Sequence, residues 1–250
     1  MLYGMHDIMF HGHRNQANIA SNWYSTDSEE LYESNLKTHY SDLDKNGWIN
    51  KTFNYEFNSC GFRSPELTSE KNIVCLGCSY TNGVGLPYDN VYGYLVAHQL
   101  NLKYNNLGVS GACTNLCFRL ALYWLNQLKP KIVIYQVPEI SRFELRVSGN
   151  AIDNEDMWKQ YNINNSTNIF YKQYVRYSEN YTLQHYRNLL GIKHLCSELN
   201  IKLIILSAED LEDCNNSADR DRARDLSHYG SNTHKQLANI VLGKINEQEY

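Results

Sequence analysis

The stretch IVCLGCSYTNGVG, residues 73–85, joins a buried-strand pattern to a glycine-rich turn. Residues 71–77 (KNIVCLG) form a short, continuous apolar run, which is typical of a strand buried on both faces of a parallel sheet. The run stops at Gly77, and Ser79 follows two residues later. Ser79 is therefore either a residue that begins a helix or a nucleophile held at the edge of a sheet.

Strand and helix patterns alternate along the chain from residue 70 onward. The segments that read as further strands are 103–108, 131–137 and 201–207, and those that read as helices are 89–100, 114–128, about 179–199 and 231–245. Asp89 and Ser231 are the expected N-caps of the first and last of these helices. The alternation predicts an α/β fold of three layers, in which a mostly parallel sheet lies between two layers of helices.

Two segments do not share this alternation. Residues 1–55 carry Trp23, Trp48, many tyrosines and short polar turns, so we expect an irregular arm or small subdomain there. Residues 56–250 then hold the layered domain, with an insertion at about 141–178 that is rich in Asn and Tyr. We expect the insertion to lie over the edge of the sheet and the arm to be a candidate contact for an oligomer or a larger assembly.

The composition limits the classes of partner. The chain has 23 basic and 27 acidic residues, a net charge of −4, and no long basic stretch, so nucleic acid is not an expected partner. The start of the chain has no signal-peptide pattern, and no apolar run reaches the roughly 18 residues of a membrane span. The seven cysteines are odd in number and scattered, which favours reduced thiols. We expect a protein of the cytoplasm or of a particle or assembly.

Asp225 and His228 stand three residues apart just before the last predicted helix. The loop that carries them and Ser79 should both lie at the carboxyl ends of parallel strands, where reactive groups gather. His228 could then take the proton of Ser79 while Asp225 holds the other ring nitrogen. Taken one at a time, Ser79 could equally be a helix cap, and the other two could form a surface ion pair.

In their order, these motifs resemble the SGNH, or GDSL-type, family of esterases and lipases. The similar stretches are GCSYTNG (77–83), NLGVSGA (106–112) and DLSH (225–228), with FNSCGFRS (57–64) as a lead-in seen in some members. The resemblance covers roughly residues 55–245. It implies a flavodoxin-like α/β/α fold, with Ser79 as nucleophile, His228 as general base and Asp225 as its orienter. It also implies that the backbone N–H groups of Ser79 and Gly111 face the oxyanion.

The sequence departs from the family pattern at the end of the third strand. The family has Gly-x-Asn-Asp there, and its Asn donates to the oxyanion, whereas this chain has YQVPEISR (135–142) with Glu139 in that region. Losing one such donor costs about 10² to 10³ in rate. Asn82 and Asn115 are candidates for a replacement donor, and the alternative is that Glu139 pairs with Arg142 and turns away.

The resemblance implies an ester hydrolase that removes O-acetyl or other short acyl groups from a carbohydrate or a related small ester. The alternative is a catalytically weak or inactive module of the same fold, serving as a glycan-binding or structural subunit. No cofactor and no metal site is expected, because the Cys75-x-x-Cys78 pair has no partner pair and the calcium-like loop at 42–53 ends in Phe53 rather than Glu. We expect His234 to lie on the last helix rather than in the site.

Overall fold

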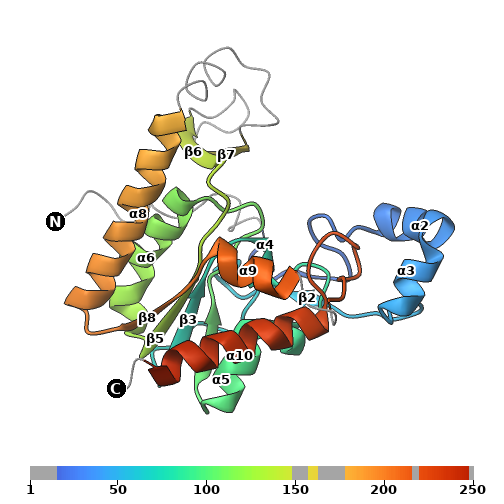
Figure 1. Cartoon of the computed structure of the whole chain (residues 1–250), viewed down its shortest axis with the longest axis horizontal. Helices are drawn as coiled ribbons and strands as arrows, with labels where there is room; N and C mark the ends of the chain where they lie inside the picture. The colour runs from blue at the N-terminus through green and yellow to red at the C-terminus, as the bar shows by residue number, and fades with distance from the viewer. Residues whose placement is uncertain (1–15, 148–156, 163–177, 216–219, 248–250) are drawn as a thin grey trace.

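The computed structural model describes residues 16–147, 157–162, 178–215 and 220–247 (Figure 1). A central sheet contains four strands in the order β4–β3–β5–β8. Their bounds are Asn72–Leu76 for β3, Lys103–Asn106 for β4, Ile132–Gln136 for β5 and Lys202–Leu206 for β8. All three pairings between neighbours are parallel. The predicted α/β fold with a parallel sheet is therefore confirmed.

Helices cover both faces of this sheet (Figure 1). α6 (Thr114–Leu128) and α8 (Ser178–Glu198) lie on one face, and α5 (Tyr92–Gln99) and α10 (Ser231–Glu247) lie on the other. Val74 and Leu76 of β3 belong to the core under the first pair, and Ile73 and Cys75 belong to the core under the second. Successive side chains of a strand point to opposite faces, so one continuous apolar run supplies both cores.

The N-terminal arm packs onto two loops of the sheet domain. It contains β1 (Ala20–Ser21), α2 (Glu29–Thr38), α3 (Tyr40–Lys45) and β2 (Tyr55–Glu56), and β1 pairs with β2 antiparallel. Leu43 and Trp48 of the arm form a buried cluster with Leu86 and Ala223 of the sheet domain. The division of the chain at residue 55 stays a prediction.

The predicted insertion begins as an antiparallel hairpin of β6 (Arg142–Val147) and β7 (Met157–Asn162). The rest of the insertion, 148–156 and 163–177, lies outside the described residues. Phe143 and Glu144 are both buried, and the Glu144 carboxylate accepts two hydrogen bonds of 2.7 Å from Arg119 on α6. The start of the insertion is thus packed against a helix of the sheet domain.

The remaining elements are short: α4 (Ser79–Asn82), a 3₁₀ turn η2 (Tyr88–Asn90) and α9 (Ala208–Asn215). The prediction of Asp89 as an N-cap was wrong, because Asp89 lies in η2 and α5 is capped by Val91 without a side-chain bond. Ser231 is the first residue of α10 rather than its cap. Within the described ranges, no helix combines the length and the apolar character that crossing a bilayer requires.

Candidate active site

Ser79 is held at the carboxyl edge of the sheet by a turn that needs glycine. β3 ends at Leu76, and Ser79 is the first residue of α4, two positions after Gly77. A Cβ on Gly77 would lie 2.1 Å from Thr81 Oγ1 and 2.9 Å from Gln136 Oε1. No other residue type fits this approach without displacing its neighbours. The strand therefore delivers Ser79 directly into a short helix at the sheet edge.

A buried arginine supports the turn that follows α4. Arg63 is 1% exposed and donates hydrogen bonds to the backbone carbonyls of Asn82 (3.3 Å), Gly83 (2.5 Å) and Leu86 (2.6 Å). Carbonyls at the end of a helix lack partners within the helix, so these donors satisfy groups that would otherwise be unpaired. The stretch 57–64, which stood out only by resemblance, thus braces the segment carrying Ser79.

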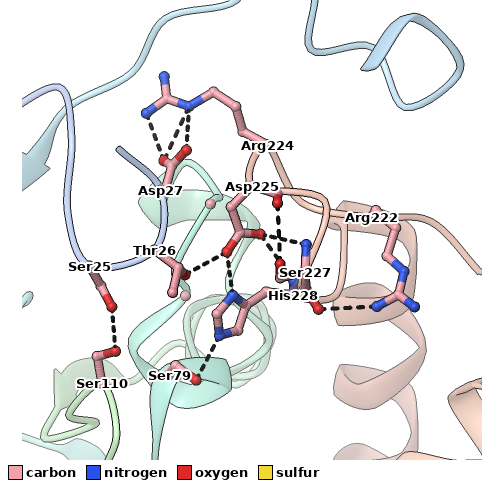
Figure 2. Close-up of polar contacts among 12 residues, drawn as sticks. Ser25, Thr26, Asp27, Ser79, Ser110, Arg222, Arg224, Asp225, Ser227 and His228 are labelled. Atoms are coloured by element: carbon pink, nitrogen blue, oxygen red, sulfur yellow. Dashed lines mark hydrogen bonds and ion pairs between the residues drawn. The ribbon is translucent and has the colours of Figure 1, made fainter. Parts of the chain in front are cut away.

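Figure 2 shows the three predicted catalytic side chains in one hydrogen-bonded row. His228 Nε2 lies 2.8 Å from Ser79 Oγ, although the two residues are 149 positions apart in the sequence. His228 Nδ1 lies 2.6 Å from Asp225 Oδ2. Both separations are within the range in which a general base can take a proton and be held by its orienter.

The three-residue spacing of Asp225 and His228 follows from the shape of their loop. Asp225 Oδ1 accepts the backbone N–H groups of Ser227 and His228, each at 3.0 Å. Leu226 takes the left-handed conformation with φ 56°, which turns the chain between the two side chains. An Asp side chain that caps its own turn in this way leaves its second oxygen free for the imidazole.

The Asp225 carboxylate is buried yet remains a good anion. Burial alone would raise its pKa, but the hydrogen bond and charge of His228, together with the hydrogen bond from Thr26, lower the pKa below its ordinary value. A carboxylate that stays ionised can hold the imidazole in one tautomer and stabilise the imidazolium that forms on proton transfer.

Two residues of the N-terminal arm reach this site, and neither was predicted from the sequence. Thr26 Oγ1 donates to Asp225 Oδ2 at 2.7 Å, and Ser25 Oγ lies 2.7 Å from Ser110 Oγ, next to Gly111 (Figure 2). No motif marks Ser25 or Thr26, and 199 positions separate Thr26 from Asp225. Only the folded chain shows that they belong to the site.

The candidate oxyanion donors differ in their exposure and in their hydrogen bonds. Gly111 is exposed with φ 77°, and Ser79, as the first residue of α4, has an N–H without an acceptor inside its helix. Asn82 is buried, and one of its two amide N–H groups donates to the Gly108 carbonyl at 3.1 Å. Asn115 is half-buried as the second residue of α6.

Glu139 follows the end of β5, as predicted, and pairs locally. Its carboxylate accepts a hydrogen bond from Ser141 Oγ at 2.6 Å and lies 3.6 Å from Arg142 Nη2. The pairing of Glu139 with Arg142 is therefore present. The pair places a positive charge beside the Glu139 carboxylate.

A cavity of about 640 Å³ lies beside the residues that flank Ser79 in the sequence. Cys78 and Tyr80 line it together with apolar side chains from the ends of β5 and β8 and from α8 and α9, namely Val137, Ile140, Leu189, Ile205 and Leu211. The Tyr80 ring also meets His228 edge to face, with centroids 5.2 Å apart. The cavity therefore adjoins the hydrogen-bonded residues Ser79, His228 and Asp225 through Tyr80.

Among the residues that the structure describes, no three His, Cys, Asp or Glu side chains are grouped closely enough to hold a metal ion. The Cys75 thiol lies inside β3, and its burial raises its pKa. Such a thiol is poorly suited to ligation, because metals bind the thiolate.

Comparison with known proteins finds no matching family model and no matching curated protein, but it does find solved structures of similar fold. The psychrotrophic esterase EstA from Pseudoalteromonas sp. is 13% identical over 72% of this chain and 98% of its own, with a TM-score of 0.40. A family 3 carbohydrate esterase from Clostridium thermocellum is 16% identical over 68% and 92%, with a TM-score of 0.36.

A mutant of esterase AlinE4 is 17% identical over 54% of this chain, with a TM-score of 0.34, and the match spans 58% of the esterase's length. At these identities and scores, the comparisons say nothing about the activity of this chain. The chain is similar in fold to these esterases.

Proposed function

We propose that the chain is a serine-dependent ester hydrolase that works through an acyl-enzyme. The observation that carries the proposal is the row of two hydrogen bonds, 2.8 Å from Ser79 Oγ to His228 Nε2 and 2.6 Å from His228 Nδ1 to Asp225 Oδ2. A hydroxyl beside an imidazole that is itself oriented by a buried carboxylate is the arrangement that activates serine as a nucleophile.

In the first half of the proposed reaction, Ser79 Oγ attacks the carbonyl carbon of the ester while His228 Nε2 takes the hydroxyl proton. Asp225, ionised and hydrogen-bonded at Nδ1, stabilises the imidazolium. The tetrahedral intermediate then collapses, the alcohol leaves with the proton from His228, and the acyl group remains on Ser79.

In the second half, water attacks the acyl carbon and His228 takes a proton from it. The ester bond to Ser79 breaks, Ser79 Oγ recovers its proton from His228, and the carboxylic acid is released. The backbone N–H groups of Ser79 and Gly111 are the proposed donors to the oxyanion in both halves, with Asn115 as a candidate third. Asn82 is the weaker candidate, because it is buried and one of its two amide N–H groups binds the Gly108 carbonyl.

The proposed substrate is a short acyl ester of a carbohydrate or a related small molecule. Three features of the cavity support this choice. Its apolar lining suits a short acyl chain, and Tyr80 offers an aromatic ring beside the nucleophile, a group on which sugar faces commonly stack. Glu139 and Arg142 on the same wall can exchange hydrogen bonds with hydroxyl groups.

A second candidate is a weakly active or inactive module that binds glycans. The observation that favours it is the carboxylate of Glu139 after β5, together with the Gly108 carbonyl that one N–H of the Asn82 amide binds. In this case the protein would not hydrolyse a panel of aryl and sugar esters, yet isothermal titration calorimetry would record binding of an oligosaccharide.

The first test follows hydrolysis of p-nitrophenyl acetate by the wild type and by Ser79→Ala. We expect kcat to fall by about 10³-fold or more, because the variant has no nucleophile for the acyl step. Ser197→Ala, an exposed serine at the end of α8, is the matched control and should keep the wild-type rate.

Mass spectrometry after fluorophosphonate treatment gives an independent result, with one adduct expected on Ser79. Equal rates for the wild type and Ser79→Ala would remove Ser79 from the mechanism. An adduct at another residue would do the same.

A further inference from the structure

Three consecutive residues of the N-terminal arm each contact a different part of the proposed active site (Figure 2). Ser25 bonds Ser110, which precedes the proposed oxyanion residue Gly111. Thr26 donates to the buried carboxylate of Asp225 at 2.7 Å. Asp27 forms an ion pair with Arg224, the residue before Asp225. The arm therefore contacts both the loop that carries Gly111 and the loop that carries Asp225 and His228.

The arm is held rigidly at this point. The backbones of Tyr24 and Asp27 bond to each other in both directions, at 2.9 and 3.1 Å, which closes a tight turn around Ser25 and Thr26. The Asp27–Arg224 pair is only 1% exposed on either side chain, and the Arg224 guanidinium lies 4.1 Å from the ring of Trp23. Thr26 is therefore oriented before any substrate arrives.

The hydroxyl of Thr26 supplements what the Asp225 loop provides for itself. Asp225 Oδ1 is occupied by backbone N–H groups of Ser227 and His228, while Oδ2 binds the imidazole. Within the described ranges, Thr26 gives Asp225 its one hydrogen bond from outside residues 225–228, and it does so on Oδ2, the oxygen that holds His228. Without the Thr26 hydrogen bond, only contacts within residues 225–228 would limit rotation of the Asp225 carboxylate.

We infer that Thr26 is a positioning residue of the proposed catalytic row. Its hydroxyl fixes the Asp225 carboxylate and binds the same carboxylate oxygen as His228. This inference rests on the proposed function. A donor on Oδ2 draws negative charge away from the imidazole, so losing it strengthens the attraction between Asp225 and the imidazolium. The protonated form of His228 is then favoured, and His228 serves as a base only at higher pH.

The test compares Thr26→Val, which keeps the shape of the side chain and removes the donor, with Thr26→Ser, which restores the donor. In Thr26→Val we expect kcat/KM for p-nitrophenyl acetate to fall about tenfold at neutral pH and the acid limb of its pH profile to move up by about half a pH unit. Thr26→Ser should recover both. Thr38→Val, which breaks a hydrogen bond on exposed α2, is the matched control and should change neither.

The pH shift is specific to Thr26, because the substitutions at Thr26 alter none of the other ionisable residues near His228. These are Tyr80 on α4, which meets the His228 ring edge to face, His234 on α10, and Arg224, whose charge is paired with Asp27. A purely structural role for Thr26 would lower the melting temperature and leave the pH profile in place, which would overturn the inference.

Imidazole NMR of the free protein separates this inference from the proposed function. If the wild type hydrolyses no ester, the proposed function fails, yet the titration midpoint of His228 can still be compared between Thr26→Val and Thr26→Ser. A midpoint that is higher by about half a unit in Thr26→Val alone supports the inference. Identical midpoints in folded variants overturn it. Should Thr26→Val not fold, Thr26→Ala removes the same donor with less bulk and takes its place.

Discussion

His234 lies six residues after His228, yet the fold gives the two imidazoles opposite environments. His234 is buried on α10, where its Nδ1 accepts the backbone N–H of Tyr92 at 3.1 Å. Its Nε2 has no hydrogen-bond partner among the described residues. Burial, with smaller contributions from the charges of His228 and Arg63, lowers the pKa of His234 from 6.5 to about 3. His234 is thus a neutral part of the core, on the last helix as predicted.

This burial makes the stability of the protein depend on pH. Between pH 6.5 and about 3 the unfolded chain binds a proton at His234 that the folded chain does not, so the free energy of unfolding falls as the pH falls through this window. His234→Gln keeps an acceptor for Tyr92 and removes the titration. We expect urea unfolding between pH 6.5 and 4 to show a slope shallower by up to about 1.4 kcal/mol per pH unit in this variant.

His98→Gln is the control for that experiment, because His98 is exposed on α5 and its imidazole reaches solvent in both states. It should keep the wild-type slope. If His234→Gln also kept that slope, the acid sensitivity would belong to other groups, and the neutral buried state of His234 would be wrong.

Residue-scale features of the proposed site divide into those that a local pattern predicts and those that it does not. Ser79, Asp225 and His228 could be proposed because each stands next to a strand or helix boundary that the hydrophobic pattern marks. Thr26 could not, because its role depends on the chain returning across 199 positions. Asn82 illustrates the converse: its residue type suits an oxyanion donor, but in the fold one of its amide N–H groups binds the Gly108 carbonyl.

At the scale of elements, regular hydrophobic patterns predicted the sheet and, with its exact bounds, one of the helices that cover it. The predicted helix at 114–128 is α6, Thr114–Leu128, and it ends where Lys129 adopts the left-handed conformation before a proline. The four strands were each predicted to within two residues at either end. In β3, β5 and β8 the signal is a largely apolar run, which is typical of strands covered on both faces, whereas β4 reads KYNN.

The elements that were missed or misread lack such a pattern. The start of α10 is capped by Asp221, whose carboxylate accepts the N–H groups of Asn232 (2.8 Å) and Thr233 (2.9 Å), so a residue ten positions upstream takes the role predicted for Ser231. In β6, neighbours Phe143 and Glu144 are both buried although they point to opposite faces. A charged residue on an inward face removes the alternation by which a strand is normally found.

That inward charge leads to a prediction about the hairpin of β6 and β7. Glu144 binds Arg119 through both oxygens in a buried setting, so Glu144→Gln leaves the guanidinium without its carboxylate. Removing one partner of a buried pair costs about 3 kcal/mol or more. We expect urea unfolding to show a loss of that order in the variant.

Glu139→Gln is the matched control, three positions before the start of β6. Its pair with Arg142 is longer, at 3.6 Å, and the Glu139 side chain is half exposed, so the loss should stay below about 1 kcal/mol. Equal losses in the two variants would show that burial does not decide the strength of the Glu144 pair.

At the scale of the whole molecule, the arm joins two loops of the sheet domain that both carry parts of the proposed site. Tyr55 in β2 donates to Asp27 at 2.5 Å and accepts the N–H of Gly85 at 2.7 Å, just beyond α4. Asp27 in turn pairs with Arg224 in the His228 loop. Through this connection the arm holds the segment after Ser79 and the loop of His228 in one arrangement.

Asp27→Asn therefore tests whether the arm and the sheet domain depend on each other. The change leaves the buried Arg224 charge without its carboxylate, which we expect to cost about 3 to 5 kcal/mol in urea unfolding. Because Thr26 adjoins Asp27, we also expect slower fluorophosphonate labelling of Ser79 in the fraction of protein that remains folded.

Asp42→Asn on α3 is the matched control, because its pair with His39 is exposed on both sides and should contribute less than about 1 kcal/mol. If the arm were only an appendage, Asp27→Asn would match this control in stability and would label Ser79 at the wild-type rate. If instead both quantities fall, the arm is part of the machinery that holds the row from Ser79 to Asp225. A single transition in the urea curve would then show that arm and sheet unfold as one unit, since loss of a separate arm would appear as an earlier step.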